Sequence, residues 1–81
     1  MPLSTAWRDL DRATVGRAPD RPGVYELGED GTVRSIGHGV LRDELKSALA
    51  YDDAAQVRWK STHTLDEAAT LAAEHRDRLE S

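Results

Sequence analysis

A β-hairpin is encoded in residues 22–37, which read PGVYELGEDGTVRSIG. Residues 23–27 have β-branched and aromatic side chains at their centre, as strands do. An Asp-Gly pair follows at residues 30–31, and this pair tolerates the positive φ angles that a tight hairpin turn needs. Residues 32–36 then return from the turn. We therefore predict two antiparallel strands, the second of which ends at the Gly-His-Gly sequence of residues 37–39.

Three helices and one further strand are expected around this hairpin. Apolar residues at helical spacing predict a first helix over about residues 4–13 and a second over residues 40–50. Alternating apolar and basic residues predict a third strand over residues 56–61. The Thr-Leu-Asp-Glu sequence at 64–67 is a capping box that opens a last helix, which runs to about residue 79. The fold class is therefore α/β (α+β), a small three-stranded antiparallel sheet with flanking helices in the order α-β-β-α-β-α.

The length and composition limit what this chain can be. Its 81 residues suit a single domain over residues 1–81, and the lack of cysteine excludes disulfides and thiolate metal sites. No signal peptide is visible, and no apolar run approaches the roughly 20 residues that span a bilayer, so we expect a cytoplasmic protein with no membrane partner. The formal net charge of −4 disfavours strong nucleic-acid binding, because phosphate-binding surfaces are usually basic.

The balance of residue types gives a second possible explanation for the negative net charge. Arginine far outnumbers lysine, alanine is abundant and isoleucine is rare. This bias is typical of GC-rich genomes and of salt-adapted prokaryotes such as haloarchaea. In such a cell the acidity reflects solvation of the whole proteome and says less about partners.

The hairpin resembles the paired motifs that name the GIY-YIG endonuclease superfamily. Pro22-Gly23-Val24-Tyr25 is similar to the first motif, and Ser35-Ile36-Gly37 is similar to the second. A leucine-rich helix, a strand with a tryptophan and a last helix that opens Asp66-Glu67-Ala68 follow in the family's order. The resemblance covers about residues 20–80 and implies a GIY-YIG-like fold for this core.

The resemblance also implies a site, which this chain preserves only in part. In the family, two tyrosines on the sheet, an arginine on the next helix and a Mg²⁺-binding glutamate on the last helix serve phosphodiester cleavage. Tyr25 matches the first tyrosine. The other three positions fall at Ser35, Glu44 and Ala72. We therefore expect a degenerate member of the superfamily with no metal site and no cofactor; Mg²⁺ would be required only if nuclease activity survived.

A divergent endonuclease with a rearranged site is the first alternative, and it would use Tyr25, His38 and Arg42. His38 stands between two glycines directly after the second predicted strand, which leaves its imidazole accessible beside the family's active face. The structural alternatives are a packed strand aromatic for Tyr25 and a turn or capping role for His38.

Binding functions are the remaining hypotheses. Arg34, Arg58 and Lys60 could form a basic stripe across the sheet and contact a nucleic-acid backbone, or they could simply keep a strand soluble. We predict a non-catalytic module that binds nucleic acid or protein. A further alternative is a homodimer or larger homo-oligomer, in which an apolar patch around Leu49 and Tyr51 is buried against a second copy.

Overall fold

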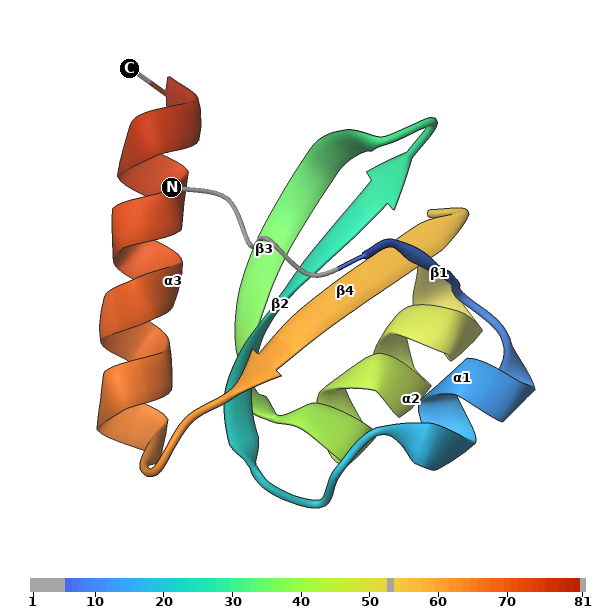
Figure 1. Cartoon of the computed structure of the whole chain (residues 1–81), viewed down its shortest axis with the longest axis horizontal. Helices are drawn as coiled ribbons and strands as arrows, with labels where there is room; N and C mark the ends of the chain where they lie inside the picture. The colour runs from blue at the N-terminus through green and yellow to red at the C-terminus, as the bar shows by residue number, and fades with distance from the viewer. Residues whose placement is uncertain (1–5, 53, 81) are drawn as a thin grey trace.

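The computed structural model describes residues 6–52 and 54–80 and contains a four-stranded antiparallel sheet between two helical layers. The elements are β1 (Arg8–Asp9), α1 (Arg12–Arg17), β2 (Pro22–Glu29), β3 (Thr32–Val40), α2 (Leu41–Tyr51), β4 (Gln56–Ser61) and α3 (Leu65–Glu80). The strands lie in the order β1-β4-β2-β3. Helices α1 and α2 cover one face of the sheet and α3 covers the other (Figure 1).

The hairpin prediction is confirmed, but β3 is longer than expected. Asp30 and Gly31 both have positive φ, 52° and 77°, and make the turn. The prediction that residues 37–39 end the second strand was wrong, because the ladder continues to Val40 opposite Pro22. The glycines serve packing instead, since a Cβ at Gly37 would overlap the ring and hydroxyl of Tyr25 on the neighbouring strand.

The first predicted helix was wrong, and the difference adds a strand to the sheet. Arg8 and Asp9 form β1 and pair with Val57 and Gln56 of β4, so the sheet has four strands where three were expected. The helix begins only after Asp11, whose side chain accepts a hydrogen bond from the Thr14 amide at 2.8 Å. The amphipathic spacing of this segment is equally compatible with edge pairing, which satisfies the backbone groups on the outer side of β4. Residues 4 and 5 of the predicted helix lie outside the described residues.

The remaining elements match their predictions closely. The second helix and the third predicted strand appear as α2 and β4, and the Thr64 hydroxyl accepts the Glu67 amide at 3.0 Å, as a capping box requires. No helix among the described residues has the length and apolar character needed to cross a membrane. The element order is therefore β-α-β-β-α-β-α, with an extra strand before the first helix.

The core has one part on each face of the sheet. Under α1 and α2 the buried residues are Val15, Ala18, Leu27, Leu45, Ala48, Ala54 and Val57. Under α3 the buried cluster contains Val24, Ile36 and Ala72. Alanines at positions 68 and 72 bring α3 close to the sheet, because their side chains are short and fully buried. This two-sided burial decides which side chains of β2 meet α2 and which meet α3.

Candidate functional site

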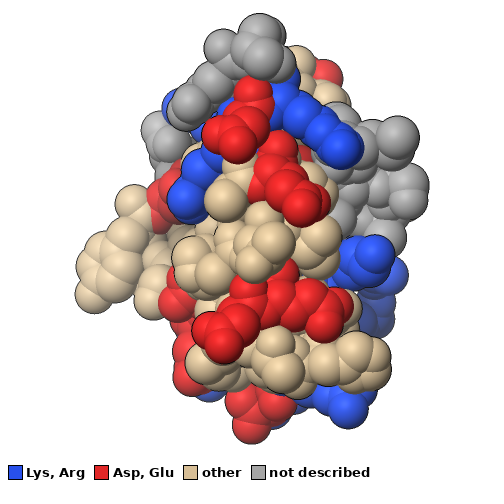
Figure 2. Space-filling view, turned by 90° about the vertical axis from the view of Figure 1, so that its left-hand side faces the viewer, with Lys and Arg blue, Asp and Glu red and all other residues tan. Residues whose placement is uncertain are grey.

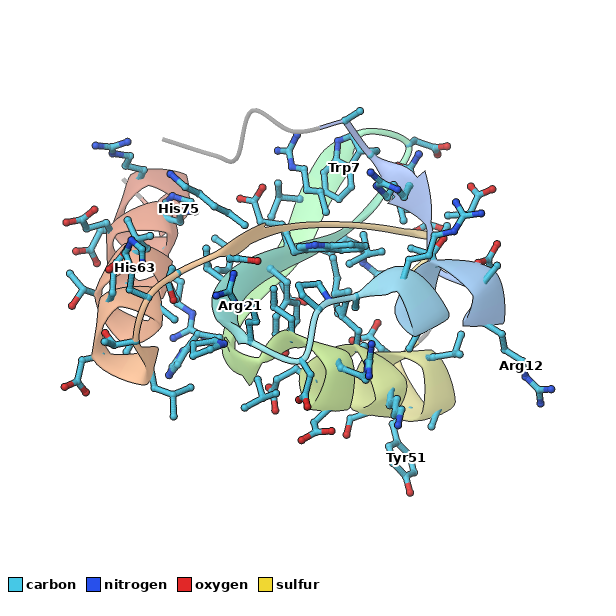
Figure 3. The ribbon with its side chains drawn as sticks, turned by 60° about the horizontal axis from the view of Figure 1, so that its bottom comes forward. Trp7, Arg12, Arg21, Tyr51, His63 and His75 are labelled. Carbon is cyan, nitrogen blue, oxygen red and sulfur yellow. The ribbon has the colours of Figure 1, made fainter. Side chains whose placement is uncertain are left out.

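A pocket of about 380 Å³ lies between the sheet and α2, on the face that carries Tyr25. Its lining comes from β2, β3, α2 and the residue after α2: Tyr25, Leu27, Ser35, Ile36, Glu44, Ser47, Ala48, Tyr51 and Asp52. The two strand positions that the family resemblance marks, Tyr25 and Ser35, therefore do share one cavity. Tyr51 borders this cavity and is 91% exposed, and its ring points away from α2 into solvent (Figure 3).

Tyr25 is held by a carboxylate. Its hydroxyl donates a hydrogen bond to Glu44 Oε1 at 3.2 Å, and the missing side chains of Gly37 and Gly39 make room for the two groups. Burial, reinforced by the negative charge and hydrogen bond of Glu44, raises the pKa of Tyr25 to about 12. Asp52 acts in the same direction and Arg76 opposes it. Tyr25 is therefore a protonated hydrogen-bond donor at neutral pH.

The electrostatics of this pocket are negative. Glu44 and Asp52 line it, whereas no lysine, arginine or histidine appears among the described lining residues. The guanidinium of Arg76 lies nearby, but its Nη2 donates to the Ile36 carbonyl at 2.7 Å and so is committed to the backbone of β3. A phosphodiester entering this pocket would meet two carboxylates, which repel it.

The position expected for a metal-binding glutamate belongs to the core. Ala72 is fully buried and packs against Val24 and Ile36 under α3. Glu74, two residues further on, is exposed. Across residues 6–52 and 54–80, no group of three His, Cys, Asp or Glu side chains is placed to hold a metal ion.

The three residues of the divergent-nuclease hypothesis do not converge. His38 lies opposite Val24 in the sheet, and opposite residues share a face, so His38 is on the α3 side. Tyr25, the next residue along β2, faces α2. Arg42 is exposed, and its Nε donates to the Ala18 carbonyl at 3.1 Å, toward the end of α1.

The three residues of the predicted basic stripe are also placed differently from one another. Arg34 pairs with Glu29 at 3.3 Å beside the hairpin turn. Arg58 is directed inward: its side chain is 13% exposed, and its Nε donates to Glu26 Oε1 at 2.6 Å. Lys60 is exposed near the opposite end of β2, across from Val24. Arg58 and Lys60 therefore share the α3 face, and Arg34 lies apart from them.

Two groups of polar residues were missed in the sequence. The first is the buried Glu26, which contacts Arg58 and lies 3.8 Å from His75 Nδ1. A glutamate in an alternating strand gives no signal that it is buried. The second is Arg8, whose guanidinium carbon lies 5.4 Å from the ring centroid of Trp59. A helix over residues 4–13 would have placed Arg8 on a solvated helical surface, far from any strand partner.

The outer face of α3 is acidic. Figure 2 shows aspartate and glutamate side chains gathered along this face, with basic side chains toward its margins. Over residues 65–78 of this helix, the exposed acids are Asp66, Glu67, Glu74 and Asp77. This face and the Tyr25 pocket therefore both carry negative charge, and the β1–β4 side of the sheet is where arginine and tryptophan side chains meet.

Comparisons with known proteins agree with the fold. A family described as "Domain of unknown function (DUF7508)" matches residues 1–78. Among solved structures, the chain is similar to the GIY-YIG N-terminal endonuclease domain of UvrC from Thermotoga maritima bound to magnesium, its catalytic divalent cation. That match has 25% identity and a TM-score of 0.74, and it covers 83% of this chain and 86% of that chain. A point mutant of the same domain, also bound to its catalytic divalent cation, matches equally well. No curated protein matches the chain.

These matches confirm the coarse fold prediction. The chain has a mixed α/β fold with an antiparallel sheet and three helices, as the GIY-YIG domain does. The strand number and the order of elements differ from the sequence-based prediction, because β1 replaces the start of the first predicted helix.

Proposed function

The chain belongs to the family described as domain of unknown function DUF7508, and we propose that it is a non-catalytic, nucleic-acid-binding module on a nuclease-like fold. The observation that carries this proposal is the Tyr25–Glu44 hydrogen bond inside an acid-lined pocket. It places a carboxylate in the pocket where a nuclease would need groups that bind the negatively charged phosphodiester. The nuclease-like fold suggests that the ligand is a nucleic acid. The carboxylates of the pocket argue against cleavage of that ligand.

Cleavage would require a base, a metal or another positive group at the reacting phosphate. With its pKa raised to about 12, Tyr25 stays protonated at neutral pH, so it is a poor base. Glu44 and Asp52 add negative charge where negative charge would develop. Without a bound cation, two carboxylates oppose the negative charge that develops in phosphodiester hydrolysis, which supports the non-catalytic part of the proposal.

Binding is supported by a different part of the molecule. Arg8 and Trp59 meet at the β1–β4 edge of the sheet. Trp59 pairs with Tyr25 across the sheet, but neither Arg8 nor Trp59 lines the Tyr25 pocket. Arginine with exposed aromatic surface is the combination that contacts phosphates and stacks on bases. Because the overall charge is negative, we expect weak binding that depends strongly on salt.

Two assays on the purified chain test this proposal. Single-stranded and duplex DNA and RNA are incubated with Mg²⁺ or Mn²⁺, and the expected result is no cleavage. Cleavage that is lost in Tyr25→Phe would refute the non-catalytic part and restore the nuclease alternative. Electrophoretic mobility shift at low salt is expected to detect binding. Failure to bind any of these nucleic acids would refute the nucleic-acid-binding part of the proposal.

A protein partner is the second candidate, and the Tyr25 pocket itself favours it. Two carboxylates beside the exposed Tyr51 ring suit an arginine or lysine side chain, which gains both ion pairing and a cation–π contact. Titrating an arginine-rich peptide into the ¹⁵N-labelled protein should shift amide signals around the end of α2, and Tyr51→Ala should weaken the effect. Self-association through Leu49 and Tyr51 would appear instead as a mass that rises with protein concentration.

A further inference from the structure

A second, smaller pocket of about 230 Å³ opens at the outer edge of β4. It is lined by Ala6, Arg8, Arg58 and Trp59. Arg58 and Trp59 are neighbours in a strand, so their side chains point to opposite faces of the sheet. A pocket that touches both residues therefore lies at the strand edge, beyond the two residue pairs through which β1 joins β4.

The two arginines of this pocket differ in charge compensation. Arg58 is neutralised by Glu26 at 2.6 Å, and its guanidinium lies over the Trp7 ring at 4.1 Å, so it forms part of the fixed wall. Arg8 is exposed and makes no ion pair with another described residue. Its guanidinium is held 5.4 Å from the centroid of the Trp59 ring. The uncompensated positive charge of the pocket therefore belongs to Arg8.

This arrangement selects a ligand that is both flat and anionic. A guanidinium beside an indole ring combines a flat cation with an aromatic surface, and guanidinium N–H groups are donors for phosphate oxygens. A nucleotide with an unstacked base satisfies both features at once. A base inside a duplex cannot reach the surface, because both of its faces are covered by neighbouring base pairs.

We propose that the Arg8–Trp59 pocket binds one nucleotide of single-stranded nucleic acid, with the base against the Arg8–Trp59 pair and the phosphate on Arg8. This inference rests on the proposed function and deepens it, because it names the strandedness of the ligand and the place of contact. It assigns no role to the Tyr25 pocket, whose carboxylates would repel the same ligand.

Tryptophan fluorescence makes the pocket observable. In a Trp7→Phe variant, Trp59 is the sole tryptophan and reports directly on the pocket. A short oligothymidylate at low salt is expected to quench its fluorescence, and a duplex of equal length is expected to bind about tenfold more weakly. In the same background, Arg8→Ala should weaken oligothymidylate binding about tenfold. Arg8→Lys should weaken it less, because lysine keeps the positive charge although it lacks the planar guanidinium.

Arg12 provides the matched control. It is an exposed arginine on α1 that points away from the body of the molecule (Figure 3), so Arg12→Ala removes the same charge elsewhere and should bind like the parent. Circular dichroism verifies that each variant is folded. Equal mobility shifts for the parent and Arg8→Ala would refute nucleotide binding at the Arg8–Trp59 pocket. Equal losses of affinity in Arg8→Ala and Arg12→Ala would refute it as well. Either result would leave the proposed function in place. If the parent shifts no oligonucleotide, both proposals fall together.

Discussion

Replacing Glu26 with alanine is expected to remove a large part of the domain's stability. Glu26 lies in the middle of β2 with 0% of its side chain exposed, and its Oε1 accepts from Arg58 Nε at 2.6 Å. The Arg58 side chain is itself only 13% exposed. Deleting one partner of such a pair leaves a buried charge uncompensated, which typically costs about 3–5 kcal/mol.

That cost is large for a domain of this size. At roughly 0.05–0.15 kcal/mol per residue, the free energy of unfolding of 81 residues is about 4–12 kcal/mol. Glu26→Ala should therefore lose about a quarter or more of the stability, and at the low end of this stability range it should unfold. Arg58→Ala should be comparably harmful, because it removes the guanidinium that donates to the buried Glu26 carboxylate at 2.6 Å.

Urea unfolding followed by far-ultraviolet circular dichroism measures these costs without relying on the Trp7 signal, which Arg58 perturbs. The double variant Glu26→Ala, Arg58→Ala should cost clearly less than the sum of the two single variants, since it removes both buried charges. Glu29→Ala is the control, because Glu29 pairs with Arg34 on the same hairpin with about half of each side chain exposed; it should cost less than about 1 kcal/mol. Strict additivity, or a Glu26→Ala cost as small as that control, would refute the reasoning.

Three further predictions follow from local geometry. Gly37→Ala drives a methyl group into the Tyr25 ring, and by overpacking it should lower the free energy of unfolding by about 1–3 kcal/mol in urea titrations. Because the pKa of Tyr25 rises from 10.0 to about 12 on folding, the unfolded state loses this proton first, so stability should fall as pH rises from 10 to 12; Tyr25→Phe should flatten that fall, and an unchanged slope would contradict the assignment. Thr64→Ala deletes the cap of α3 and should cost about 1 kcal/mol, whereas Thr70→Ala within the same helix should cost less.

The hairpin and the later elements were predictable because their signals are local. An Asp-Gly turn flanked by strand-forming residues specifies a hairpin through backbone φ alone, and a Thr-x-x-Glu sequence specifies a helix start through its own hydrogen bonds. The family resemblance also implied that positions 25 and 35 on the hairpin belong to one site, and both residues line the same pocket. In each case the deciding atoms lie within a few residues or one strand pair of each other.

The N-terminal segment was not predictable in this way. Trp7, Arg8 and Leu10 fit a helical pattern as well as a strand, and local propensity does not separate the two. The choice was made by contacts distant in sequence: β4 offers backbone partners to Arg8 and Asp9, and the Trp7 ring lies over Arg58. This pairing creates the Arg8–Trp59 pocket. The proposed nucleotide site therefore depends on a strand that cannot be predicted from the local sequence.

The sequence by itself therefore determined the hairpin, the two longer helices and their order, because these depend on turn chemistry and periodicity. Only the tertiary structure decided that Glu26 and Arg58 form a buried pair, that Gly37 makes room for the Tyr25 ring, and that His38 and Tyr25 occupy opposite faces. The physical reason is that burial and charge compensation are properties of neighbours. In this small sheet, those neighbours come from strands and helices far apart along the chain.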